Sequence, residues 1–264
     1  MSNRIERKFH LLKTQNKKAF IAFITAGDPT LKITEELVLA FETVGVDIVE
    51  LGVPFSDPLA DGPTIQAASE RALKNKVTLA KVLDTVEHIR KGSQIPIALM
   101  TYYNPIFSFG EEKLIERARK AGVDGLIVPD LPPEEAVSLI QRAGKADIST
   151  VFFLSPTTTI ERIKTITEAS TGFIYYVSLT GVTGARKKLP SSIFQNVKTA
   201  RQFTAKPICV GFGIASVPQV KSIAAIADGV IVGSAIIEEI AKNAGRRDLV
   251  ENAAQFVSKL TKGL

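Results

Sequence analysis

Glu50 is the residue whose type and surroundings point most directly to chemistry. It lies in a largely apolar run at residues 47–53, which the pattern predicts to be a β-strand. Side chains alternate along a strand, so Glu50 shares one face with Ile48 and Gly52, and the larger hydrophobic set occupies the other face. We expect that larger set to pack against helices and Glu50 to point into the interior. A carboxyl group in apolar surroundings has a raised pKa and can donate a proton near neutral pH, whereas the alternative is a structural glutamate with a partner.

A second carboxylate, Asp61, follows in the long loop after this strand. The loop also carries Asp57 before Pro58, which could simply start a turn. Asp61 precedes Gly62 and could cap a helix predicted over residues 64–74. Two carboxylates at one site could instead supply an acid and a base, because different surroundings separate their pKa values.

Glycines cluster after the last three predicted strands. They occur in the segments GVTG at residues 181–184, GFG at 211–213 and GS at 233–234. A short helix predicted over residues 235–242 would direct its N-terminus at an anion. We therefore expect a phosphate group to bind at Thr183, Gly184, Gly211, Phe212, Gly213, Gly233 and Ser234, although tight turns also need glycine. The basic loop at residues 185–190 could cover the phosphate or be a solvated loop.

Large apolar side chains recur at or near the ends of the predicted strands. They could form the walls of a site for an aromatic substrate, or could simply fill the interior. These residues are Phe23, Tyr102, Ile127, Phe153, Tyr175 and Phe212.

The one cysteine, Cys209, and two histidines exclude an intramolecular disulfide and a zinc cage, so we expect no metal.

The elements that must position these groups are eight β-rich runs separated by helical patterns. The runs cover residues 19–25, 47–53, 95–102, 125–130, 150–155, 173–179, 207–213 and 229–234. Most are almost continuously apolar, as parallel strands covered on both faces are. A weak repeat brings Asp47, Asp124 and Asp228 each to the start of a run. We predict a single (β/α)8 barrel domain over residues 1–264, with an extra N-terminal helix at residues 4–14; an open doubly wound sheet is the alternative.

Composition excludes several classes of protein. The chain has 264 residues, of which 45% are hydrophobic and 23% charged, as in a globular protein rather than a disordered one. The net charge of +6 is scattered, so we expect no nucleic acid partner. No apolar run approaches the roughly 18 residues of a membrane span, and residues 1–9 resemble no signal peptide. We expect a cytoplasmic protein, or a plastid one only if a transit peptide has been removed.

The segment ELGVPFSDPLADGPTIQ at residues 50–66 closely resembles the signature of the tryptophan synthase alpha subunit family. The resemblance continues through TAGDP at 25–29, GVTG at 181–184, GFGI at 211–214 and GSA at 233–235. It implies a (β/α)8 lyase that cleaves indole-3-glycerol phosphate to indole and glyceraldehyde 3-phosphate without a cofactor. It also implies that Glu50 protonates the indole ring carbon that bears the side chain, and that Asp61 accepts a hydrogen bond from the indole N–H.

The resemblance further implies a partner, a pyridoxal-phosphate-dependent beta subunit bound in an alpha2 beta2 complex. It places contacts with this subunit at Pro54, Asp57, Asn104, Phe107, Leu131 and Pro132, although a local turn could also explain residues 104–107. Some family members carry arginine where this chain has Leu179, so any loop contact of that arginine is in question. Two alternatives remain open: a catalytically weak regulatory subunit that binds a phosphate ligand and activates the beta subunit, and a sugar-phosphate isomerase or epimerase.

Overall fold

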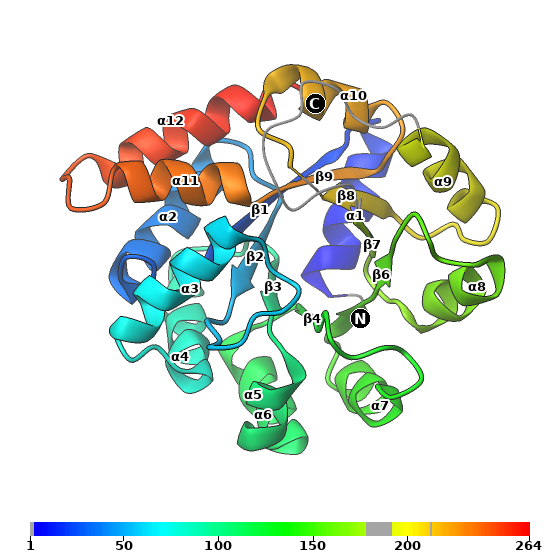
Figure 1. Cartoon of the computed structure of the whole chain (residues 1–264), viewed down its shortest axis with the longest axis horizontal. Helices are drawn as coiled ribbons and strands as arrows, with labels where there is room; N and C mark the ends of the chain where they lie inside the picture. The colour runs from blue at the N-terminus through cyan, green and yellow to red at the C-terminus, as the bar shows by residue number, and fades with distance from the viewer. Residues whose placement is uncertain (1–2, 178–191, 212) are drawn as a thin grey trace.

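The computed structural model describes residues 3–177, 192–211 and 213–264. Its strands are all parallel and follow the order β5-β4-β3-β2-β1-β9-β8-β7-β6 in one sheet (Figure 1). The strands are β1 (Ala19–Thr25), β2 (Ile48–Gly52), β3 (Ile97–Met100), β4 (Gly125–Ile127), β5 (Ser149–Val151), β6 (Phe153–Leu154), β7 (Ile174–Val177), β8 (Ile208–Gly211) and β9 (Gly229–Val232).

The two ends of this sheet are halves of one interrupted strand. Only Phe152 separates β5, which pairs with β4, from β6, which pairs with β7. The sheet therefore closes on itself, and its strands fall within the eight predicted runs except Ser149, which begins β5 one residue early. The barrel prediction is confirmed, and the open doubly wound sheet is wrong.

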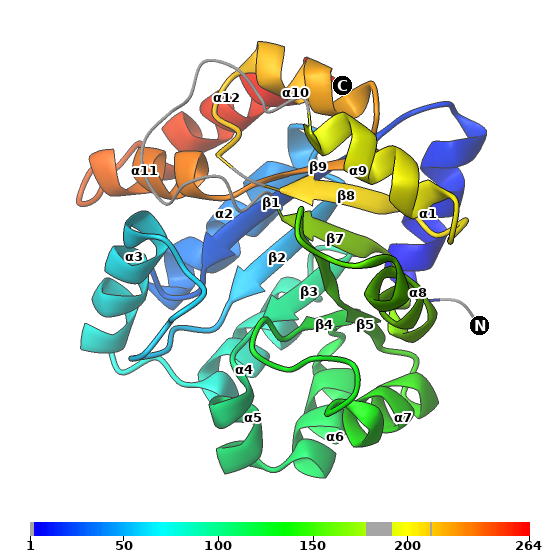
Figure 2. The same ribbon diagram turned by 45° about the vertical axis from the view of Figure 1, so that its right-hand side comes forward.

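Helices surround the barrel as an outer layer, apart from α1 (Figures 1 and 2). They are α1 (Arg4–Thr14), α2 (Leu31–Thr43), α3 (Pro63–Lys74), α4 (Leu79–Ile89), α5 (Tyr103–Phe109), α6 (Glu111–Ala121), α7 (Val137–Lys145), α8 (Ile160–Ala169), α9 (Ser192–Arg201), α10 (Val217–Ala224), α11 (Ser234–Lys242) and α12 (Leu249–Thr261). The extra N-terminal helix has the predicted bounds. The short helix after β9 begins at Ser234, one residue earlier than predicted. Every helix within the described ranges is too short or too polar to cross a bilayer.

Alternation along the strands separates two hydrophobic layers. The side chains of Ile21, Ile48 and Ala98 belong to an inner cluster that fills the barrel. Val49 and Leu51 belong to the outer cluster between strands and helices. This separation gives residues 48 and 50 the inward face of β2, as the sequence predicted.

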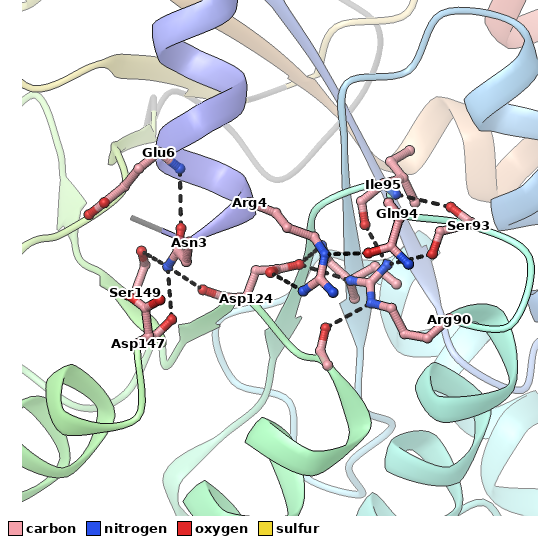
Figure 3. A network of polar contacts seen from close by, with 12 residues as sticks. Asn3, Arg4, Glu6, Arg90, Ser93, Gln94, Ile95, Asp124, Asp147 and Ser149 are labelled. Carbon is pink, nitrogen blue, oxygen red and sulfur yellow. Dashed lines mark hydrogen bonds and ion pairs between the residues drawn. The ribbon is translucent and has the colours of Figure 1, made fainter. Parts of the chain in front are cut away.

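The N-terminal helix closes the end of the barrel where the strands begin (Figure 2). Its Ile5, Phe9 and Leu12 join the inner cluster. Asn3, which caps this helix, donates from Nδ2 to the backbone oxygens of Asp124 and Asp147 at 3.0 and 3.2 Å (Figure 3). This end of the barrel is therefore filled by helix and polar network, which leaves the opposite end for a site.

The repeated aspartates join neighbouring strands at this closed end. Each accepts a backbone N–H from the adjacent strand on its carboxylate, and each donates its own N–H to the oxygen of the same residue. The pairs are Asp47 with Phe20, Asp124 with Ile97 and Asp228 with Ile208, at carboxylate distances of 2.9, 2.9 and 2.8 Å. The weak internal repeat in the sequence thus has a structural cause at the start of β2, β4 and β9.

Candidate active site

Glu50 lies inside the barrel with no exposed surface. Its strand neighbours in register are Phe23 of β1 and Ala98 of β3. Neither carboxylate oxygen has a hydrogen-bond partner among the described residues. Burial alone raises the pKa of Glu50 to about 8, so the group is mostly protonated at neutral pH.

The charge of Glu50 affects the pKa values of two side chains on other strands of the barrel. An ionised Glu50 contributes to raising the pKa of the Tyr175 hydroxyl on β7 and the Cys209 thiol on β8, after the larger effect of burial. Both groups therefore stay neutral. Among the described residues, burial is the one cause of the raised pKa of Glu50, and no cation there favours its ionised form.

Asp61 is held by Tyr102 rather than used as a helix cap. The Tyr102 hydroxyl donates to Asp61 Oδ2 at 3.1 Å and accepts the backbone N–H of Ala60 at 2.9 Å. The N-cap of α3 is Gly62, with no side-chain cap. Burial raises the pKa of Asp61 to about 6, and the Tyr102 hydrogen bond opposes that rise. Asp61 is thus mostly ionised at neutral pH, while Glu50 is mostly protonated.

A small cavity opens where strands β1, β2 and β3 end. Three of the residues that line it are candidates from the sequence, Phe23, Asp61 and Tyr102. The other lining residues are Thr25, Gly52, Val53, Ile65, Ser69 and Met100, to which sequence reasoning gave no role. For Thr25 a signal existed, because it lies two residues after Phe23 and so shares its face of β1.

Two glycines make room for the ring of Phe23. A Cβ atom at Gly52 would lie 2.7 Å from Phe23 Cζ, and one at Gly233 would lie 3.2 Å from Phe23 Cδ1. Real side chains do not tolerate the first of these distances. Gly52, the last residue of β2, and Gly233, which follows β9 as the N-cap of α11, therefore lie against Phe23 on the two sides of β1.

The remaining apolar candidates fill the barrel. Ile127 belongs to the inner hydrophobic cluster, and Phe153 and Tyr175 pack against it with ring centroids 4.8 Å apart. None of the three lines the small cavity at the ends of β1, β2 and β3. A contact with substrate stays a prediction for these residues.

The structure describes three of the glycines and the serine of the expected phosphate site. Gly211 ends β8, Gly213 has a φ of 55°, and Gly233 is the N-cap of α11 without a side-chain cap. The first N–H groups of a helix have no partner within it, so those at Ser234 and after it suit an anion. Thr183, Gly184, Phe212, Leu179 and the loop at 185–190 lie outside the described residues.

The residues predicted to contact the beta subunit differ in how exposed they are in this chain. Asp57, Asn104 and Phe107 are exposed, Pro132 is half-buried, and Pro54 and Leu131 are buried in this chain. Phe107 is 71% exposed and stands on α5, so residues 104–107 form a helix and the turn alternative is wrong. Leu59, which sequence reasoning missed, is 94% exposed on the loop that carries Asp61.

Across residues 3–177, 192–211 and 213–264, no group of three or more metal-ligating side chains occurs.

Comparison with protein families decides the identity of this site. The family model described as tryptophan synthase alpha chain matches residues 9–264. The chain belongs to the tryptophan synthase alpha chain family. The resemblance seen in the sequence is confirmed, and with it the assignment as a carbon–carbon lyase that cleaves indole-3-glycerol phosphate.

Individual tryptophan synthase alpha chains agree with this result. The chain is 47% identical over 258 residues to that of Thermoanaerobacter pseudethanolicus, covering 98% of each chain. It is 48% identical over 261 residues to that of Geotalea daltonii, covering 99% of this chain and 98% of the relative. Members of this family work with a beta subunit.

Solved structures share the fold. The alpha subunit from Legionella pneumophila superposes with a TM-score of 0.93 at 37% identity, covering 100% of this chain and 98% of that one. A chain of the tryptophan synthase complex from Pyrococcus furiosus gives 0.85 at 37% identity, covering 92% and 97%.

Proposed function

We propose that this chain cleaves indole-3-glycerol phosphate with Glu50 as the proton donor and Asp61 as the charge-stabilising group. The observation that carries the proposal is a pair of carboxyl groups with different pKa values, both of which act on the pKa of Tyr175 inside the barrel. Glu50 is protonated by its burial, and Asp61 is ionised and turned toward Tyr102. One acid and one anion are what the cleavage needs.

The first step transfers the Glu50 proton to the ring carbon that bears the glycerol phosphate. The ring nitrogen then carries positive charge as an iminium ion. The Asp61 carboxylate accepts the ring N–H and lies opposite that charge, which stabilises the intermediate. Tyr102 fixes one oxygen of Asp61 and leaves the other for the ring.

The second step breaks the carbon–carbon bond. The Glu50 carboxylate, now ionised, takes the proton of the hydroxyl on the carbon next to the ring. Electrons of that O–H bond form the carbonyl of glyceraldehyde 3-phosphate, and the bond to the ring returns its electrons to the indole. Glu50 ends protonated, so its two transfers balance over one turnover.

The phosphate of the substrate would bind at the N-terminus of α11. Gly233 and Ser234 would supply main-chain N–H groups there, and Gly233 lies so near the Phe23 ring that a Cβ atom at this position would be 3.2 Å from Phe23 Cδ1. Phe23 therefore connects the anion site to the cavity that Asp61 lines. Thr183, Gly184, Gly211, Phe212 and Gly213 would complete this proposed phosphate site, and Ile127, Phe153 and Tyr175 would contact the substrate.

We also propose the assembly and location expected from the sequence. Two copies of the chain would join two beta subunits, each docking on a barrel mouth through Pro54, Asp57, Asn104, Phe107, Leu131 and Pro132. The exposed members of this set, Asp57, Asn104 and Phe107, would supply polar and apolar contacts to that subunit. The complex would be located in the cytoplasm. All 264 residues of this chain would form one domain.

The test of the catalytic pair is turnover of indole-3-glycerol phosphate by Glu50→Gln and Asp61→Asn with purified beta subunit present. Each variant keeps the size of its side chain and loses the acid or the anion. We expect the Glu50 variant to lose about 10²–10⁴-fold in kcat, because positioned proton transfer contributes that much. Glu112→Gln, the same change at an exposed position of α6, should keep the wild-type rate. Unchanged indole formation by Glu50→Gln would show that the proposed acid is wrong.

A further inference from the structure

Thr25 carries a buried polar atom that the proposed mechanism does not use. It is the last residue of β1, which is otherwise entirely apolar. Its side chain is 2% exposed, and its Oγ1 has no hydrogen-bond partner among the described residues. An unpaired buried hydroxyl destabilises a protein relative to the apolar side chain of the same shape, which is valine. A threonine here therefore needs a reason beyond packing.

Thr25 is one of the residues that line the small cavity at the ends of β1, β2 and β3. Thr25, Ser69 and Asp61 all line it, and it has room for about one water molecule. A buried water needs two to four polar partners, and these three side chains would provide them. Asp61 has capacity to spare, because a carboxylate accepts about four hydrogen bonds and Tyr102 donates one.

We propose that Thr25 is a positioning residue for Asp61, whose hydroxyl, with that of Ser69, hydrogen-bonds the Asp61 carboxylate through one water held in this cavity. The inference rests on the proposed function, because it acts through Asp61. Tyr102 and the Thr25 water would hold the carboxylate by two contacts rather than one. A carboxylate held in this way keeps its free oxygen directed at the ring N–H and does not reorganise when charge develops.

The test replaces Thr25 in the full chain with beta subunit present. Thr25→Val removes the hydroxyl and keeps the shape, and Thr25→Ser keeps the hydroxyl. We expect Thr25→Val to lower kcat/KM for indole-3-glycerol phosphate by up to about tenfold, the upper part of the range for one ordinary hydrogen bond. Thr25→Ser should stay within about twofold of the wild type. The melting temperature of Thr25→Val should equal or exceed that of the wild type, since no hydrogen bond within the chain is lost.

A double-mutant cycle with Asp61→Asn distinguishes positioning from a separate effect. If Thr25 acts through Asp61, Thr25→Val should change the residual rate of Asp61→Asn by less than about twofold. The matched control is Thr150→Val, a buried strand threonine outside the cavity whose hydroxyl donates to the backbone oxygen of Ala169 at 3.4 Å. It should lose stability and keep kcat/KM.

Three outcomes would overturn the inference, and they differ from one another. Wild-type kcat/KM in Thr25→Val, with Asp61→Asn impaired, would refute the role of Thr25 alone. An equal tenfold loss in both backgrounds would show that Thr25 does not act through Asp61. A wild-type rate in Asp61→Asn would refute the proposed function itself, and the role of Thr25 with it.

Discussion

Glu50 is buried and has no hydrogen-bond partner among the residues that the structure describes, an arrangement that destabilises the folded chain once the carboxyl group must ionise. Its pKa is about 8 when folded against an ordinary value of 4.5. Between these values the unfolded chain releases a proton that the folded chain keeps. The free energy of unfolding therefore falls as pH rises through this window.

We predict that Glu50→Gln removes this dependence. The variant should gain stability relative to the wild type by up to about 1.4 kcal/mol per pH unit between about pH 5 and pH 8. Urea unfolding at pH 5.5, 6.5 and 7.5 measures the difference, with Glu112→Gln as the exposed control. Parallel stability curves for the wild type and Glu50→Gln would contradict the shifted pKa.

The sequence predicted the inward direction of Glu50 but not the role proposed for Thr25. Alternation along β2 is enough to orient a charged residue among Ile48 and Gly52, because the charge marks the face. The position of Thr25 on the same face of β1 as Phe23 was a signal, but its residue type adds none, because threonine is common in strands. That its hydroxyl is unpaired depends on residues of β3 and α3, which only the folded chain brings near.

At the level of elements, the closed end of the barrel holds the strands together. Asp124 accepts from Arg4 at 2.9 Å, from Arg90 at 2.8 Å and from the N–H of Ile97 at 2.9 Å (Figure 3). Arg90 is itself largely buried and also donates to the backbone oxygens of Gly122 and Ile95. The network thus joins α1 and α4 to the starts of β3 and β4.

We predict that Asp124→Asn destabilises the chain by about 3–5 kcal/mol, because it leaves the buried Arg90 without its counter-charge. Asp84→Asn is the matched control, since Asp84 also pairs with an arginine, Arg117, but is 57% exposed. The control should change stability by less than about 1 kcal/mol. Equal losses in urea unfolding for the two variants would contradict the stabilising role of the network.

Element types were predictable and element ends were less so. Near-continuous apolar runs predict parallel strands, and β1 has the predicted bounds at Ala19–Thr25. The run at residues 95–102 contains the shorter strand Ile97–Met100, because pairing with β2 and β4 ends where the chain turns into α5. The break between β5 and β6 at Phe152 could not be predicted from the run of apolar residues. It arises because β5 pairs with β4 and β6 pairs with β7.

For the whole molecule, the two ends of the barrel have different tasks. The closed end carries α1 and the aspartate pairs, and the open end carries Asp61 and the exposed Phe107 and Leu59. In the proposed assembly, the beta subunit would cover Phe107 and Leu59 and remove their apolar surface from water. The family signature made the open end recognisable from the sequence, whereas the burial of Pro54 and Leu131 required the folded chain.

We predict that Phe107→Ala weakens binding to the beta subunit by about 1–3 kcal/mol, because a central aromatic anchor contributes that much to an interface. Titration calorimetry with purified beta subunit measures the affinity. Leu11→Ala is the control, since Leu11 is 49% exposed but lies on α1 at the closed end. A loss in both variants, or in Leu11→Ala alone, would contradict docking at the open end.

The most direct test of Glu50 as the proton donor is the pH dependence of kcat/KM for indole-3-glycerol phosphate cleavage in the complex. The wild type should lose activity below about pH 6, where Asp61 becomes protonated, and above about pH 8, where Glu50 becomes ionised. Glu50→Gln should have a low rate without the alkaline decline. A Gln variant that keeps the wild-type rate and the same alkaline decline would contradict the account.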